Sequence, residues 1–176
     1  MPTLLSPLSV AGLTLRNRIA MPPMWSGQAG ADGSVTDRIV EYHRVRAAAG
    51  CGLITVEHSF VHPGGRHSAT QLGLCDDAMI PGLARLAAAI TSEGAVACLQ
   101  ISHAGSRASS AVLGRKPVAP SAVRHPGEPD GGQSSQQGEH QHLAIMGQFL
   151  KHQNRRRARE RGWHPVGYNP YFSSRR

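Results

Sequence analysis

Paired cysteines are absent from this sequence. The three cysteines, Cys51, Cys75 and Cys98, lie far apart and form no Cys-x-x-Cys motif. Oxidising compartments favour paired cysteines, so three separate thiols indicate a reduced, cytoplasmic protein. We expect Cys51 at a helix–strand junction and Cys98 inside an apolar strand, where a free thiol packs as a small apolar side chain.

Long apolar stretches are absent too. No run approaches the roughly 20 residues that a helix needs to cross a bilayer. The N-terminus also lacks the basic stretch followed by an apolar core that marks a signal peptide. We therefore expect no membrane partner.

Lysine is scarce and the chain is short. Lys116 and Lys151 are the only lysines among the 19 basic residues, which is typical of a GC-rich gene. The 176 residues suffice for one ordinary domain. A closed eight-stranded β/α barrel typically takes roughly 250 residues, so we expect no complete barrel of that kind.

The net charge of +8 is spread unevenly. Residues 1–123 contain ten Lys and Arg and seven Asp and Glu residues, whereas residues 124–176 contain nine Lys and Arg and four Asp and Glu residues. A basic excess is one mark of proteins that bind nucleic acid or anionic membranes. Because the first part is only mildly basic, nucleic acid is not the partner that we favour.

Short apolar strands alternate with helices over the first two-thirds of the chain, which favours parallel strands joined by right-handed crossovers. Thr36 is a good N-cap for the first helix, and Gly50 suits its end. The strand after it is apolar without alternation, as in a parallel sheet covered on both faces. Residues 4–15 suit a small hairpin or a plug before the first core strand. The other expected elements are a strand over 19–21, a helix over 37–49, a strand over 52–56, a loop over 58–74, a helix from 76 to 93 and a strand over 95–101. The second helix should have an apolar stripe of Leu83, Leu86, Ala87 and Ile90.

Polar or unusual residues follow each of the three main strands. In β/α barrels the active site lies at the carboxyl ends of the strands. Strand ends are often polar merely because they reach solvent, but three on the same face favour a site. The three ends are Pro22-Pro23-Met24-Trp25, Glu57-His58-Ser59 and Gln100-Ile101-Ser102-His103.

Several segments resemble, in the right order, the Old Yellow Enzyme family of FMN-dependent oxidoreductases. The resemblance covers roughly residues 4 to 127. Its pieces are Leu5-Ser6-Pro7-Leu8, Gly12 to Ile19, Pro22-Pro23-Met24, Gly52 to Glu57, Pro63-Gly64-Gly65-Arg66, Leu72-Gly73-Leu74 with Asp76-Asp77, Leu99 to Gly105 and Pro117 to Ser121.

The resemblance implies an α/β fold: a partial TIM-type (β/α)8 barrel, roughly its first three strand–helix units, over residues 1–123. It also implies FMN as cofactor, NADH or NADPH as electron donor, and a small electrophilic alkene as substrate. By the resemblance, Pro23, Met24 and Trp25 meet the flavin ring largely through backbone groups, His58 lies close to the ring, and Gln100 hydrogen-bonds its pyrimidine edge.

The sequence also departs from the family pattern. Trp25 and His58 stand where the family commonly has small or polar residues. The family's later strands carry its paired substrate-binding residues, its proton-donating Tyr and its phosphate-binding loops, and none has a counterpart here. We therefore assign no catalytic acid and expect a truncated product with little or no activity.

The alternation of apolar strands and helices does not continue over residues 124–176. Their composition predicts a disordered, low-complexity basic tail. A reading-frame shift in a GC-rich gene would produce such a tail, and a natural variant terminus is the alternative. His140 and His142 lack a third ligand at useful spacing, so no metal site is predicted. The Arg155 to Arg161 cluster leaves one alternative function, nonspecific binding of nucleic acid by a non-catalytic protein. Another alternative is a half-barrel that closes its sheet as a homo-oligomer.

Overall fold

The computed structural model describes residues 1–10 and 12–118. Its first element is an antiparallel hairpin of strands β1 (Leu8–Val10) and β2 (Leu13–Leu15). Gly12 in the turn has a φ of 77°, a left-handed conformation that glycine adopts without strain. Of the two structures expected over residues 4–15, a hairpin or a plug, the chain forms the hairpin.

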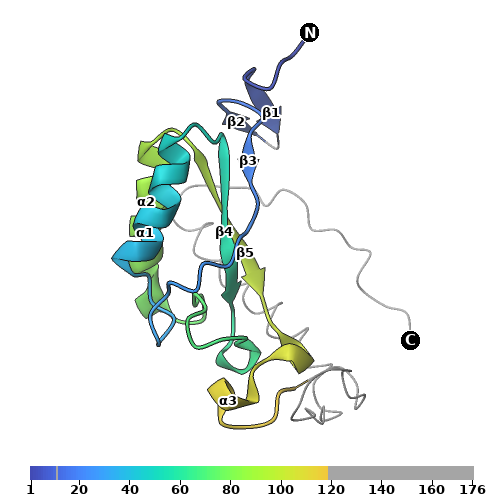
Figure 1. Ribbon diagram of the computed structural model, residues 1–176, viewed down its shortest axis with the longest axis vertical. Coiled ribbons are helices and arrows are strands. Elements are labelled where there is room, and N and C mark those ends of the chain that lie inside the picture. The colour runs from blue at the N-terminus through green and yellow to red at the C-terminus, as the bar shows by residue number, and fades with distance from the viewer. Residues whose placement is uncertain (11, 119–176) are drawn as a thin grey trace, which may run out of the picture. The chain divides into compact units, whose positions relative to one another are not determined.

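A three-stranded parallel sheet forms the centre of this part of the chain (Figure 1). Its strands are β3 (Ala20–Met21), β4 (Leu53–Phe60) and β5 (Val96–Ser102), in the order β3-β4-β5. Both strand pairs are parallel, as the strand–helix alternation predicts. Their carboxyl ends therefore lie at one edge of the sheet, and the hairpin lies toward the other (Figure 1).

The first crossover helix, α1 (Asp37–Ala48), begins and ends where local chemistry predicts. The Thr36 hydroxyl accepts a hydrogen bond from the Ile39 amide at 3.3 Å, and Asp37 lies in the first turn, where its charge suits the helix dipole. Gly50, with a φ of 108°, follows the helix end.

The second crossover helix begins later than expected. The Asp76 carboxylate accepts from the Ala78 amide at 2.7 Å and starts a short 3-10 helix, η2 (Asp77–Met79), before α2 (Ile80–Ser92). Asp76 thus caps a 3-10 turn that begins at Asp77, and the α-helix proper starts at Ile80. Pro81 lies in the first turn of α2, as expected.

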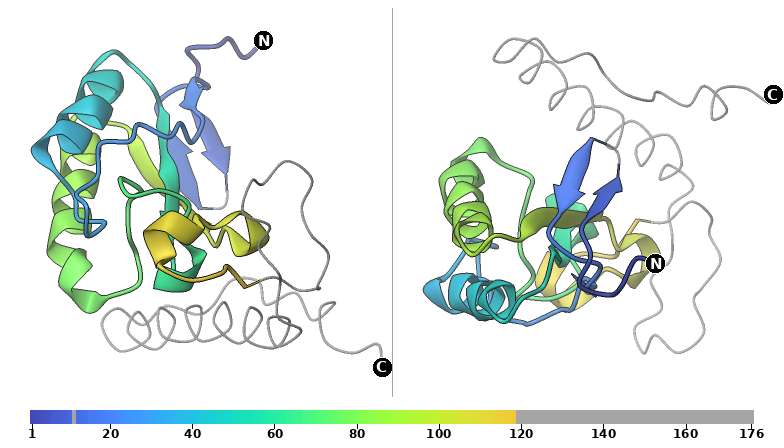
Figure 2. Two further views of the ribbon diagram at one scale, coloured as in Figure 1. Left: turned by 60° about the horizontal axis from the view of Figure 1, so that its bottom comes forward. Right: turned by 90° about the horizontal axis from the view of Figure 1, so that it is seen from above.

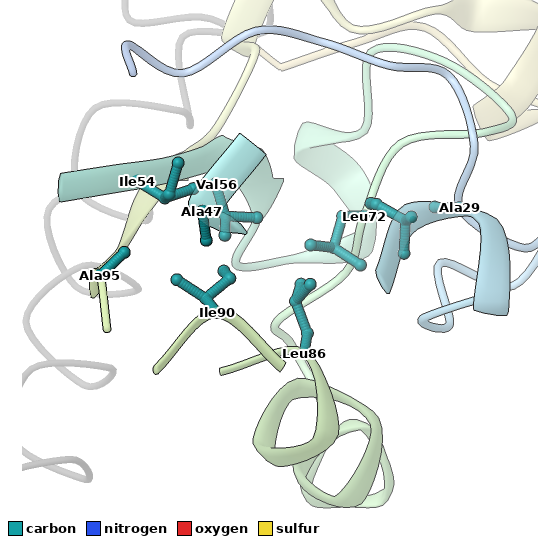
Figure 3. Packing of buried hydrophobic residues seen from close by; sticks show 9 residues of the cluster. Ala29, Ala47, Ile54, Val56, Leu72, Leu86, Ile90 and Ala95 are labelled. Atoms are coloured by element: carbon teal, nitrogen blue, oxygen red, sulfur yellow. The ribbon is translucent and has the colours of Figure 1, made fainter. Parts of the chain in front are cut away.

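Helices α1 and α2 lie side by side on one face of the sheet (Figures 1 and 2). Leu86 and Ile90 from α2 point toward Ile54 and Val56 of β4 (Figure 3). Ala87 was expected in the apolar stripe of α2 but is exposed. The buried apolar cluster consists of Ala29, Ile39, Ala47, Ile54, Val56, Leu72, Leu86, Ile90 and Ala95.

The opposite face of the sheet is open in the described part of the chain, contrary to the expected cover on both faces. Cys98 and Gln100 are exposed and alternate along β5 with half-buried neighbours, so they share the face away from the helices. Cys98 pairs in register with Thr55, next to the pair formed by buried Ile54 and Ala97. The prediction that Cys98 is an apolar packing residue is therefore wrong.

At the amino ends of the strands, Arg16 and Asn17 tie the sheet to the helix ends. The Arg16 guanidinium donates to the carbonyl oxygens of Ala47 at 2.5 Å, Cys51 at 2.8 and 3.2 Å, and Glu93 at 2.7 Å. The Asn17 amide donates to the Gly50 carbonyl at 2.7 Å. These contacts explain why polar Arg16 and Asn17 lie between the hairpin and β3.

Short elements complete the loops at the carboxyl ends of the strands. They are the 3-10 helices η1 (Pro63–Gly65) and η3 (Gly105–Arg107) and the one-turn helix α3 (Ser110–Leu113). No helix in the described ranges is long and apolar enough to cross a bilayer. The expected boundary at residues 123 and 124, and every feature predicted beyond it, lie outside the described residues.

Candidate functional site

Strand β4 continues past its predicted end and carries two of the polar residues inside the strand. Glu57 was expected at the end of the strand and His58 in the following loop, but β4 extends to Phe60. The reason is long-range pairing: Ser59 and Phe60 pair with Ile101 and Ser102 of β5. The following loop also returns to Phe60, whose amide donates to the Leu72 carbonyl at 2.9 Å and whose carbonyl accepts from the Leu74 amide at 2.8 Å.

A β-bulge lies at the polar end of β4. Val56 pairs with Leu99 and Ser59 pairs with Ile101, so two residues, Glu57 and His58, lie opposite the single residue Gln100. Bulges bend a strand and redirect its side chains, and they are frequent beside active sites. The bulge therefore brings the predicted site residues His58 and Gln100 to neighbouring positions on two strands.

The segment after β3 is fixed to this bulge. The Ser26 amide donates to Oε2 of Glu57 at 2.7 Å, a charge-assisted hydrogen bond. Pro23 is half-buried, whereas Met24 and Trp25 are 52% and 51% exposed. Large apolar side chains at half exposure, held in place by a buried carboxylate, form a surface that a flat aromatic ligand can cover.

A row of three rings joins the first two strand ends. His67 lies between the other two, with its ring centroid 6.5 Å from that of Trp25 and 6.2 Å from that of His58. Both contacts are edge-to-face, at interplanar angles of 77° and 79°. His67 was not among the predicted site residues, because only the folded-back loop brings it to the strand ends.

Gln71 holds this loop against both strands. Its Oε1 accepts from the His67 amide at 2.7 Å, and its Nε2 donates to the His58 carbonyl at 3.3 Å and lies 3.2 Å from the Ser102 hydroxyl. The side chain is 1% exposed. Gln71 was also missed, since nothing in its local sequence distinguishes it from an ordinary loop glutamine.

Close packing in the same region requires glycine at position 65. A Cβ on Gly65 would lie far inside van der Waals contact of the His103 ring. The His103 ring stacks on the His62 ring, with centroids 6.1 Å apart and an interplanar angle of 25°. The Pro63-Gly64-Gly65-Arg66 segment therefore packs closely against the end of the third strand.

The electrostatics favour a neutral His58. Burial lowers the pKa of His58 below its usual range, the Glu57 carboxylate opposes this shift, and His67 adds to it. A neutral imidazole has one N–H donor and one acceptor nitrogen. Together with the exposed amide of Gln100, it offers directional hydrogen bonds beside the apolar Met24 and Trp25.

These groups fit a flavin ring. The exposed Trp25 and Met24 can cover a planar aromatic system, and the Gln100 amide can both donate to and accept from its polar edge. No group of three or more His, Cys, Asp or Glu side chains within the described residues has the arrangement of a metal site. His140 and His142 lie outside those residues.

Comparison with known proteins assigns the chain to a family. The NADH:flavin oxidoreductase / NADH oxidase family model matches residues 3–149. Among curated proteins, the chain is 44% identical over 124 residues to an NADH oxidase from Thermoanaerobacter brockii and 45% identical over 124 residues to a metal reductase from Desulforamulus reducens. These matches cover 69% and 70% of this chain but only 19% and 18% of the relatives.

A solved structure shows the same fold. The Old Yellow Enzyme homologue from Zymomonas mobilis superposes with a TM-score of 0.75 at 28% identity, over 86% of this chain and 45% of that one. The predicted fold, the first strand–helix units of a TIM-type barrel, is thereby confirmed. This chain belongs to the NADH:flavin oxidoreductase / NADH oxidase family, the FMN-dependent oxidoreductases of the Old Yellow Enzyme type.

Proposed function

We propose that this chain provides an FMN site in an NAD(P)H-dependent oxidoreductase that reduces electrophilic alkenes such as enones or dienoyl thioesters. Bound FMN supplies hydride transfer between the nicotinamide and the alkene. The family match supports FMN, and the name of the NADH oxidase relative supports NADH as electron donor. The alkene class comes from the sequence resemblance.

The observation that carries the proposal is the convergence of three strand ends. Glu57 ties the segment after β3 to β4, and the bulge sets His58 and Glu57 opposite Gln100 of β5. The His67 ring contacts both the Trp25 ring and the His58 ring. Residues from three separate strands thus form one surface with apolar and hydrogen-bonding parts.

Each predicted site residue has a role in this proposal. Pro23, Met24 and Trp25 orient the ring, and Trp25 also excludes water from one side of it. His58 holds an N–H donor close to the ring because burial keeps its imidazole neutral. Gln100 directs its amide to the pyrimidine edge, where donors stabilise the negative charge of the reduced ring.

The test is a titration of the purified chain with FMN, monitored by flavin absorbance and fluorescence. We expect saturable binding with a perturbed flavin spectrum, and oxidation of NADH or NADPH in the presence of an enone is then assayed on the same sample. Gln100→Leu removes one hydrogen bond to a charge-bearing edge and should raise the dissociation constant about tenfold.

Thr91→Ala on the exposed side of α2 is the matched control and should leave FMN affinity unchanged. Absence of saturable FMN binding by the folded wild-type chain would contradict the proposal. Equal FMN affinity of Gln100→Leu and the wild type would contradict the role given to Gln100.

A further inference from the structure

Two fully buried polar side chains lie behind the candidate site, one on β4 and one on α1. Glu57 and His43 are both 0% exposed. Glu57 uses Oε2 to accept from Ser26, but Oε1 has no hydrogen-bond partner. His43 places Nδ1 2.9 Å from the Ile39 carbonyl, and its Nε2 has no partner.

The hydrogen bond to Ile39 decides the tautomer of His43. A carbonyl oxygen only accepts, so Nδ1 must carry the proton and donate it. Burial lowers the pKa of His43, the bond to Ile39 and the Glu57 carboxylate oppose this, and Arg46 adds to it. In the neutral ring, Nε2 is then an acceptor, as is the Glu57 Oε1 atom.

Two buried acceptors need a donor. An unpaired buried polar atom costs of order a whole hydrogen bond, and the cost is greater for a charged group. Neither atom accepts from a described residue, and the nearby Arg46 guanidinium instead donates to the Tyr42 carbonyl at 2.6 Å and stacks 3.5 Å from the Tyr42 ring centroid. A water molecule has two O–H groups and can donate to both atoms at once.

Glu57 also adjoins or contacts each of the three strand ends. It directly precedes His58, lies in the bulge opposite Gln100, and binds the amide of Ser26, the residue after Trp25. A change at Glu57 therefore acts on all three strand ends, although its side chain is buried behind them.

We propose that Glu57 is a positioning residue for the flavin surface, whose Oε2 fixes the Trp25–Ser26 segment and whose Oε1 shares one internal water with Nε2 of His43. This inference rests on the proposed function for its consequence, FMN affinity. The hydrogen-bond network itself can be tested without FMN.

The first experiment compares Glu57→Gln with Glu57→Leu in the full chain. Glutamine keeps an acceptor for Ser26 and adds N–H donors on the side of His43, so its FMN dissociation constant should stay within about threefold of the wild type. Leucine has a similar volume but no acceptor, and should raise the constant by about tenfold or more. Ile90→Val, a core change on α2, controls for loss of stability alone.

The second experiment needs no cofactor. In NMR spectra of the wild-type chain, the Ser26 amide proton should be shifted downfield by its short bond to a carboxylate, and Glu57→Gln should reduce that shift. The His43 ring should show a protonated Nδ1 and an unprotonated Nε2, with nuclear Overhauser effects to a bound water.

The outcomes separate the two ideas. If the wild type binds no FMN but shows these NMR signatures, the network stands and the proposed function fails. A folded Glu57→Leu variant that binds FMN as tightly as the wild type overturns the positioning role. A protonated Nε2 on His43, or absence of any bound water beside it, overturns the water bridge.

Discussion

Single residues that hold loops in place, such as Gln71, determine the geometry of the candidate site. Gln71 is buried and bonds to three partners that are 4, 13 and 31 residues away in sequence. Gln71→Leu would leave the His67 amide and the His58 carbonyl without these partners, at about 1–3 kcal/mol for each buried group. We expect a loss of about 2–4 kcal/mol in the free energy of unfolding.

Chemical denaturation followed by circular dichroism measures this effect. Gln28→Leu changes a half-buried glutamine in another loop and should cost clearly less. Equal losses in the two variants would show that the hydrogen bonds of Gln71 add nothing beyond its packing.

Buried histidines make stability depend on pH. The pKa values of His43 and His58 are both lowered, chiefly by burial. The unfolded state then binds more protons than the folded state between the folded pKa and the ordinary value near 6.5, so stability falls as the pH drops through this window. The slope is at most about 1.4 kcal/mol per pH unit for each histidine.

The measurement is the free energy of unfolding from urea titrations between pH 8 and pH 5.5 (about two and a half units, chosen to span the window). His43→Leu should be less stable than the wild type at neutral pH but should show a shallower fall toward acid. A variant with an unchanged slope would mean that His43 takes up no extra proton on unfolding.

At the scale of elements, Arg16 connects the ends of both helices to the sheet. Its guanidinium donates to carbonyl oxygens near the carboxyl ends of α1 and α2 and at the junction before β4. The Ala47 carbonyl also accepts from the Gly50 amide at 3.0 Å, and the helix dipole favours a cation beside the carboxyl end of a helix. Arg16→Ala should lower the free energy of unfolding by about 1–3 kcal/mol.

Two further variants sharpen this prediction. Arg16→Lys should recover only part of the loss, because a single ammonium cannot bond in the fork geometry that reaches three carbonyls. Arg18→Ala, at an exposed arginine two residues away, should stay within about 0.5 kcal/mol of the wild type. The interpretation fails if Arg16→Ala and Arg18→Ala are equally stable by denaturant unfolding.

Elements were predictable from the sequence where their causes are local. The Thr36 cap and Gly50 place α1 almost to the residue, and apolar runs locate β3 and β5. The second half of β4 was not predictable, because it depends on pairing with β5 beyond a bulge and on residues 72–74, which return to pair with Phe60. His67 and Gln71 were not predicted as site residues for the same reason, because their roles depend on contacts that form only after the loop folds back.

At the scale of the whole molecule, the sheet has two unlike faces within the described residues. One is covered by α1 and α2 and buries Ile54 and Val56 (Figure 3). The other exposes Cys98 and Gln100. In a β/α barrel the face away from the helices is the interior, so the exposure of polar Gln100 there suits a ligand site at the strand ends.

The two faces predict different reactivity for the cysteines. Cys98 is exposed on the uncovered face, whereas Cys75 is half-buried and burial raises the pKa of its thiol, which reduces the thiolate that reacts. In the native full-length chain, a maleimide should therefore modify Cys98 well before Cys75, as followed by mass spectrometry of digested samples over time. Reaction in denaturant, where both thiols are free, is the control and should remove the difference. If Cys98 reacts no faster than Cys75 in the native chain, then that face of the sheet is covered in solution, and the site at its edge would have to be entered from the strand ends alone.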